Sequence, residues 1–441
     1  MSAFESWRLE NGLRVLYQRD SAFPLTCATL LFGVGSRFEM PDQAGLCSMT
    51  LDLLMQGTRH RTARELASVM ESVGASMGTQ VHEDYAEMGF VVPSTELDRA
   101  FGVMAEVLKE PVFPRGEIIK EKAHVLAGLS SRKDAIFDVA YDSLNNALYG
   151  KHPYGRPLEG HPGTVRSFKR ADFQRWHQKR FRPEQAVLAF TGSLSASEVA
   201  RRLQKTLGTW RAAGGISAVM PAKAGTQSIF WAPSHSFQDI GRDSPLLGTA
   251  SAGVTSGSTA KDLTIHSNFE QAYLMVGYPA PCATDPDHIP LKVLNTILGG
   301  GMSSRLFATL REESGLAYEV SSFYPTRLDV SQWVIYLGLP KEKLETASRQ
   351  LEKLLHQLAD RGPTSDEVKQ ARAMIRGAFL MDRQSHRRQA WYAAWWELLG
   401  RGPGYGEEFL RAVDAVTPVQ LHRLMQKILK QPRVTVRVIP K

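Results

Sequence analysis

The chain has 441 residues, of which 43% are hydrophobic and 22% are charged, and its 53 Lys and Arg against 45 Asp and Glu give a net charge of +8. These values are typical of globular proteins and exclude the fibrous and disordered classes. No apolar run approaches the ~18 residues needed to cross a bilayer, and three widely spaced cysteines favour neither a disulfide framework nor a CxxC metal site.

The first half of the chain alternates between predicted strands and helices. Thr62 and Glu65 form a capping box, which predicts a helix beginning there and running to Val73. The other predicted elements are strands at 11–16 and 26–34, a strand ending at Pro93, a helix ending at 108, helices at 117–129 and near 171–180, and a strand at 186–191. The Lys- and Arg-rich segment 169–182 has the spacing of an amphipathic helix with a solvated basic face, so nucleic-acid binding is not expected.

The second half repeats this order at a nearly constant offset. Pro93 and Pro340, each at the end of a strand-like run, are 247 residues apart, and the helix-opening Pro114 and Pro363 are 249 apart. The other matched pairs are Gly33 with Gly277, Phe173 with Leu421, and Pro183 with Pro432. The offset predicts two homologous α+β domains at 1–211 and 262–441.

Between the two predicted domains, residues 212–261 are rich in Gly, Ser, Ala and Thr. This composition predicts a flexible linker, which is either a tether between the halves or an inserted exposed loop. The chain start, Met1–Glu5, lacks a basic segment followed by an apolar one, so no signal peptide is visible. The compartment stays unknown: cytoplasmic if this start is authentic, periplasmic if a leader was removed.

The segment Gly45–Thr58 resembles the zinc helix of the pitrilysin/insulinase-type metallopeptidases, which carry H-x-x-E-H there. In that motif two His one turn apart bind Zn²⁺ and the Glu activates water. Ser48 and Asp52 stand where the two His belong, and Leu51 stands where the Glu belongs. Gly128, 76 residues after Asp52, stands where the resemblance places the third ligand, a Glu. The chain is therefore expected to bind no zinc, and 48–55 to be an ordinary amphipathic core helix.

A second segment, Leu298–Tyr318, resembles the glycine-rich loop and the R/Y pair of the same family. Its three glycines, Gly299, Gly300 and Gly301, permit positive φ and the close approach of a backbone, which suits a loop that lines a peptide channel. Arg311 and Tyr318 are seven residues apart, as in the family pair that reaches the substrate near the zinc. A guanidinium and a phenol can both donate to the oxyanion of amide hydrolysis.

Each member of the pair also has a purely structural interpretation. Arg311 can be a surface partner of Glu312 or Asp287 in an ion pair, and Tyr318 can be a core residue.

The resemblance implies a clamshell of two domains, each a mostly antiparallel sheet with helices packed on one face. It is closest in kind to the processing-peptidase-like branch, in which a zinc subunit and a sister subunit form the chamber together. A chain without H-x-x-E-H that keeps the R/Y pair is similar to the non-zinc subunit of a bacterial-type heterodimer. Such a chain is inactive alone, holds no cofactor, and pairs with a homologous zinc-bearing subunit to act on peptides.

Two other functions remain open from the sequence. One is a structural or scaffold subunit, as in the family's relatives of the respiratory cytochrome bc complex, and the other is a stand-alone peptide-binding protein without a catalytic role. Four aromatic residues on a predicted helix, Trp391, Tyr392, Trp395 and Trp396, are either a partner hot spot or a buried core face.

Overall fold

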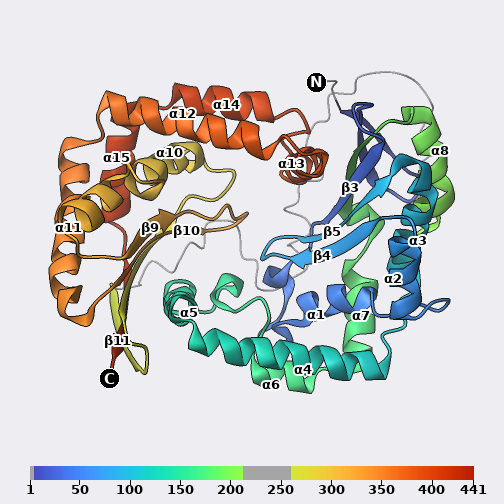
Figure 1. The fold of residues 1–441 in the computed structure, drawn as a ribbon, viewed down its shortest axis with the longest axis horizontal. Helices are drawn as coiled ribbons and strands as arrows, with labels where there is room; N and C mark the ends of the chain where they lie inside the picture. Colours follow the sequence, from blue (N-terminus) through green and yellow to red (C-terminus); the bar gives the residue numbers. More distant parts are fainter. Residues whose placement is uncertain (1–3, 212–259) are drawn as a thin grey trace.

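The computed structural model describes residues 4–211 and 260–441. Two β-sheets lie in these residues, one in each half of the chain, and Figure 1 shows them on opposite sides of the molecule. The linker expected at 212–261 lies outside the described residues except for its last two, and strand β7 already begins at Lys261. Within the described ranges, no helix combines the length and the apolarity that crossing a membrane requires.

The first half contains six strands and eight α-helices in the described residues. Its strands are β1 (Glu5–Arg8), β2 (Arg14–Arg19), β3 (Leu25–Phe32), β4 (Ser76–Val81), β5 (Ala86–Pro93) and β6 (Ala186–Gly192). Its helices are α1 (Leu46–Leu54), α2 (Ala63–Glu71), α3 (Leu97–Lys109), α4 (Arg115–Ser131), α5 (Ile136–Tyr149), α6 (Pro162–Ser167), α7 (Arg170–Arg180) and α8 (Ala196–Thr206).

The second half has five strands in the part that the structure describes. They are β7 (Lys261–Ser267), β8 (Ala272–Ala280), β9 (Glu319–Phe323), β10 (Ser331–Leu339) and β11 (Val434–Pro440). The helices are α10 (His288–Gly299), the π-helix η8 (Phe307–Glu313), α11 (Leu344–Arg361), α12 (Ser365–Asp382), α13 (His386–Leu398), α14 (Gly406–Ala415) and α15 (Pro418–Leu429).

The predicted capping box is confirmed, because Thr62 Oγ1 accepts a hydrogen bond from the backbone N–H of Glu65 at the start of α2. The first predicted strand, 11–16, is wrong at its beginning. Leu9 N donates to Leu13 O at 3.0 Å and Gly12 has φ 89°, so this stretch is the turn of a hairpin. The unpredicted strand β1 forms the other arm of that hairpin.

Both sheets have the same strand order once β1 is set aside. The orders are β1-β2-β6-β3-β5-β4 and β7-β11-β8-β10-β9. Strands β2 and β6 run parallel, as do β7 and β11, while the other pairs in each sheet are antiparallel. This equivalence confirms the duplicated α+β architecture with mostly antiparallel sheets.

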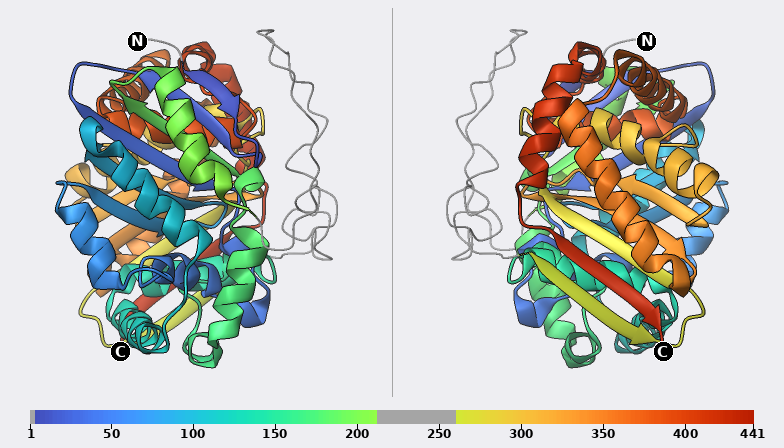
Figure 2. Two further views of the ribbon diagram at one scale, coloured as in Figure 1. Left: turned by 90° about the vertical axis from the view of Figure 1, so that its right-hand side faces the viewer. Right: turned by 90° about the vertical axis from the view of Figure 1, so that its left-hand side faces the viewer.

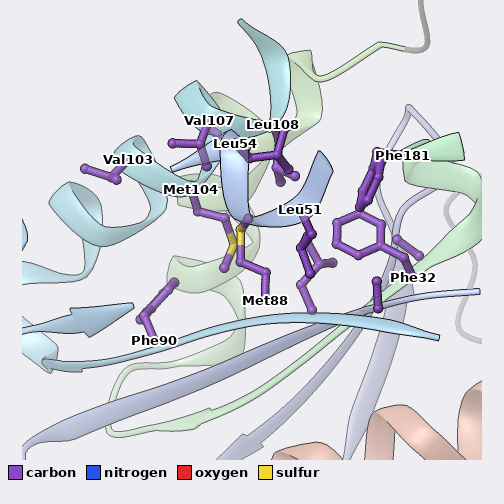
Figure 3. Packing of buried hydrophobic residues seen from close by; sticks show 14 of the residues in the cluster. Phe32, Leu51, Leu54, Met88, Phe90, Val103, Met104, Val107, Leu108 and Phe181 are labelled. Atoms are coloured by element: carbon purple, nitrogen blue, oxygen red, sulfur yellow. The ribbon is translucent and has the colours of Figure 1, made fainter. Parts of the chain in front are cut away.

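Each sheet packs its outer face against helices of its own half, and Figure 2 shows these helices from the two ends of the molecule. Strand side chains alternate between faces, so Phe32 and Met88 point toward the helices. There they meet Leu51 of α1 and Met104 of α3 in the first core (Figure 3). Burial of side chains of this size contributes about 1.5–3 kcal/mol each, so these faces hold each half together.

The inner face of each sheet is covered by a helix from the other half of the chain. Helix α13 packs on β3 and β6, and helix α5 packs on β8 and β11. Trp395 of α13 is 6% exposed and its ring lies 5.0 Å from that of Tyr85, and Trp396 is 5% exposed. The first sheet covers Trp395, and the rings of Phe379 and Tyr405 contact Trp396. For these two residues of α13, the prediction of a buried core face is therefore confirmed and that of a partner hot spot is wrong.

The two halves also meet where the turn between β4 and β5 contacts the turn between β9 and β10. Asp84, whose side chain is 4% exposed, accepts hydrogen bonds from Arg37 Nη1 at 3.1 Å, from Tyr154 Oη and from the backbone N–H of Leu328 at 2.9 Å. We call this contact the seam. Because the hydrogen bond from Leu328 crosses between the halves, the buried carboxylate of Asp84 helps to hold the two halves in their relative position.

Arg327 strengthens the seam from the second half. Its guanidinium is 3% exposed, pairs with Glu83 Oε1 at 2.7 Å and lies 4.6 Å from the centre of the Tyr154 ring. Beside it, His152 Nε2 lies 3.1 Å from Asp329 Oδ2. The hydrogen bond from His152 is the main reason why the pKa of the Asp329 carboxyl is held below its usual value.

Candidate active site

Helix α1 carries the positions at which the resemblance places the zinc ligands. Ser48 and Asp52 lie one turn apart on its partly exposed side, whereas Leu51 is fully buried among core side chains (Figure 3). Helix α1 begins where the buried Glu39 carboxylate accepts the backbone N–H groups of Gly45 and Cys47, at 3.0 and 2.6 Å. The interpretation of this segment as an amphipathic core helix is therefore confirmed.

Asp52 alone among these positions keeps a metal-ligating side chain. Its Oδ1 accepts a hydrogen bond from Thr79 Oγ1 on β4 at 3.0 Å. Burial raises the pKa of Asp52 to about 6, and the charge of Glu121 on α4 adds to that rise. Gly128, farther along α4, is exposed and offers no side-chain ligand. Apart from the nearby backbone of α4 itself, no atom lies within 4 Å of the place where its Cβ would be.

These residues do not fit zinc. A catalytic zinc needs three protein ligands, usually His, Asp, Glu or Cys. Asp52 is the one such residue at the four motif positions. Across residues 4–211 and 260–441, no three His, Cys, Asp or Glu side chains are grouped so as to hold a metal ion. The residues at these four positions on α1 and α4 therefore do not form the ligand set of a catalytic zinc.

The glycine-rich loop approaches neighbouring backbone closely. None of Gly299, Gly300 and Gly301 has positive φ, so of the two uses of glycine, close approach and a left-handed conformation, this loop has the first. A Cβ on Gly299 would lie 2.4 Å from Ser322 N, and one on Gly300 would lie 2.7 Å from Thr296 Cα. Gly299 is buried at the end of α10, so its glycine allows α10 to pack against β9. Gly300 and Gly301 are partly exposed.

The segment that carries the Arg/Tyr pair is held firmly by its backbone. Leu310, fully buried, accepts hydrogen bonds at its carbonyl from the backbone N–H groups of Leu316 at 2.9 Å and Ala317 at 3.2 Å. Lys343 Nζ donates to Gly315 O at 2.7 Å, which fixes the turn from outside. The segment begins as the π-helix η8, a rare conformation that occurs frequently at functional sites.

Both side chains of the pair project into solvent from this fixed backbone. Tyr318 is 67% exposed, and its backbone N–H donates to Gly338 O at 3.0 Å. The Arg311 guanidinium lies 4.9 Å from the centre of the Phe307 ring. Among the described residues, neither side chain forms a hydrogen bond or an ion pair, and Asp287 pairs instead with Lys427 at 2.7 Å. The structural interpretations, a core tyrosine and an ion-paired arginine, are therefore wrong.

Several residues that shape these two regions were not predicted. Thr79 donates a hydrogen bond to Asp52, and the charge of Glu121 acts on it. Lys343 and Gln350 form hydrogen bonds with the turn that precedes Tyr318. Each of these four residues belongs to a different helix, strand or turn from the motif on which it acts. No local spacing in the sequence signals such contacts, because they depend on which helices and strands pack together.

The chain was compared with protein-family descriptions, curated proteins and solved structures. Residues 14–161 match the family described as Insulinase (Peptidase family M16), and residues 167–375 match the Peptidase M16 inactive domain. The uncharacterized zinc protease YmxG of Bacillus subtilis is 26% identical over 376 residues, which is 85% of this chain and 83% of that protein. An uncharacterized zinc protease of Mycobacterium leprae is 27% identical over 429 residues, which is 96% of this chain and 88% of that protein.

Solved structures share the whole architecture. A peptidase M16 inactive domain from Pseudomonas fluorescens superposes with a TM-score of 0.85 at 22% identity, covering 100% of this chain and 98% of that one. A protease from Helicobacter pylori superposes with a TM-score of 0.83 at 20% identity, covering 99% of both chains. The two family matches together span most of this chain, and positions 48, 51, 52 and 128 carry no zinc ligand set. The chain therefore belongs to the pitrilysin/insulinase-type peptidases of family M16, as a member that lacks the zinc motif.

Proposed function

We propose that this chain is the non-zinc subunit of a heterodimeric zinc metalloendopeptidase. Its partner is a homologous subunit with an intact H-x-x-E-H motif, which holds the zinc and activates water when the two are assembled. One observation carries the proposal: Arg311 and Tyr318 stand exposed on a fixed backbone, without hydrogen bonds to the described residues, in a chain whose own zinc positions are replaced.

The chemistry of the pair suits amide hydrolysis. The tetrahedral intermediate carries negative charge on the former carbonyl oxygen, and N–H and O–H groups aimed at that oxygen stabilise it. Arg311 offers the planar fork of a guanidinium, and Tyr318 offers one phenol O–H. Because Leu310 and Ala317 are buried beside them, both donors are positioned before the substrate arrives.

The glycine-rich loop contributes to the proposed chamber through only part of its length. Gly300 and Gly301 are partly exposed and stay candidates for lining the peptide chamber, whereas buried Gly299 supports α10. The loop is tied to α12 by a hydrogen bond of 2.9 Å from Gln370 Nε2 to Ser303 Oγ, so its backbone is held in one place.

Mixing the purified chain with its zinc-bearing homologue is expected to give a one-to-one complex whose peptidase activity is well above that of the homologue alone. The reason is that the homologue gains two transition-state donors and a second chamber wall. Size-exclusion chromatography and cleavage of a quenched fluorescent peptide measure both effects. Assembly without any gain in activity would favour a scaffold subunit, and peptide binding without assembly would favour a stand-alone binding protein.

The chain purified alone is expected to contain far less than one zinc per molecule and to hydrolyse no peptide. Each position of the zinc motif lacks its ligand or its base, and Asp52 alone cannot hold the ion. Elemental analysis after dialysis against zinc checks this, with the zinc-bearing homologue as the positive control. One tightly bound zinc per chain would contradict the proposal.

A further inference from the structure

A small cavity with a polar lining lies between helix α11 and the outer face of the second sheet, which Figure 1 shows side by side. Its volume is about 10 Å³, close to the smallest space that holds one water molecule. Four polar residues line it: Ser348 and Glu352 of α11, Arg433 directly before β11, and Thr435 of β11. The rest of the lining is aliphatic, and a cavity of this size excludes organic ligands.

The register of β11 turns Thr435 toward this cavity. Thr435 pairs across the ladder with Val276, which belongs to the core under α11, whereas Val434 and Val436 belong to the core on the other face. Thr435 is 2% exposed, and its Oγ1 has no hydrogen-bond partner among the described residues. A buried hydroxyl without a partner is unfavourable, and nearly all such groups in native proteins bond to protein or to ordered water.

Glu352 and Arg433 supply charged groups at the edge of the same cavity. Arg433 Nη2 donates to Glu352 Oε1 at 2.5 Å, and both side chains are partly exposed. This bond engages one carboxylate oxygen, so the other can accept a hydrogen bond from a water molecule. Ser348 lies one turn before Glu352 on the same face of α11 and adds a hydroxyl that can donate or accept.

We propose that this cavity is the binding site of one ordered water molecule that bridges Thr435 Oγ1 and the carboxylate of Glu352. The water donates one hydrogen bond to the carboxylate and shares a second with the threonine hydroxyl, and Ser348 is its third partner. Buried waters typically make about three hydrogen bonds to groups that lack a protein partner. The site joins β11 to α11, and it does not depend on the proposed peptidase function.

Helix α11 also supports the turn that precedes Tyr318. Lys343, directly before the helix, donates to Gly315 O, and Gln350 Oε1 accepts a hydrogen bond from Ser314 Oγ at 3.0 Å. The water therefore fastens to the sheet the same helix that holds this turn in place.

A high-resolution crystal structure of the full chain is the direct test. Electron density for one water is expected about 2.5–3.0 Å from Thr435 Oγ1 and from a carboxylate oxygen of Glu352. The Thr435→Ser variant keeps the hydroxyl and is expected to keep this density, whereas Thr435→Val is expected to lose it.

The stability of Thr435→Val gives a second, independent measurement. Valine keeps the volume of the side chain and removes the hydroxyl. If the water bridges the hydroxyl, the variant loses hydrogen bonds, so the equilibrium constant of unfolding is expected to rise about two- to tenfold in a urea titration followed by circular dichroism. If the hydroxyl had no partner at all, valine would be the more stable residue, because it removes an unsatisfied buried group and suits a strand.

Thr29→Val on β3 is the matched control. Thr29 is also fully buried, its Oγ1 also lacks a hydrogen-bond partner within the described ranges, and β3 packs against α13. This variant is expected to be as stable as the wild type or more stable. The water site would be overturned by a wild-type crystal structure without density at the cavity, or by a Thr435→Val variant at least as stable as the wild type. Neither measurement needs zinc or the partner subunit.

Discussion

Replacing Tyr318 by Phe is expected to lower the kcat of the reconstituted heterodimer by about 10²–10³-fold, the usual cost of one lost transition-state donor. The change removes a single O–H from a side chain that is 67% exposed, so the stability of the fold is expected to stay the same. Steady-state kinetics of the complex measure the effect. Zinc content and complex formation should stay at wild-type values, because the tyrosine is not proposed to touch the metal.

Arg311→Ala is expected to cause a loss of similar size, and Arg311→Lys a partial one, because a point charge cannot replace a planar fork. Arg411→Lys on α14 is the matched control, since Arg411 is also exposed and forms no ion pair in the described chain. If the pair only binds substrate, KM rises while kcat holds. Wild-type kinetics in both Tyr318→Phe and Arg311→Ala would leave this chain as a passive wall of the chamber.

Asp84→Ala is expected to lower the free energy of unfolding by about 3–5 kcal/mol, the cost of removing one partner from a buried ion pair. The change leaves the Arg37 guanidinium, which is 17% exposed, without its carboxylate, and it leaves the Leu328 N–H without an acceptor at the seam. Urea titration followed by circular dichroism measures the change.

Asp262→Ala is the control for this change. Asp262 also faces an arginine, Arg437 at 3.7 Å, but its side chain is 65% exposed, so a loss of about 0–1 kcal/mol is expected. If the two variants lost the same small amount of stability, the seam would not couple the halves as described.

The sequence alone determined the features that depend on local pattern. The offset of about 247 residues revealed the duplication, because two copies of one fold need the same turns and helix starts in the same order. The capping box at Thr62 marked the start of α2, because it joins groups only three residues apart. The replacement of the zinc-motif residues by Ser48, Leu51, Asp52 and Gly128 was visible from residue identity alone.

Only the tertiary structure decided which surfaces are buried and which are open. The aromatic residues of α13 and Tyr318 are similar in type, yet the first sheet covers Trp395 while Tyr318 stays in solvent. Similarly, the seam at Asp84 and the pairing of Arg433 with Glu352 join residues that are far apart in the chain. The spacing of hydrophobic residues predicts that one side of a helix or strand is buried. Which other element covers that side depends on the free energy of packing all the elements together.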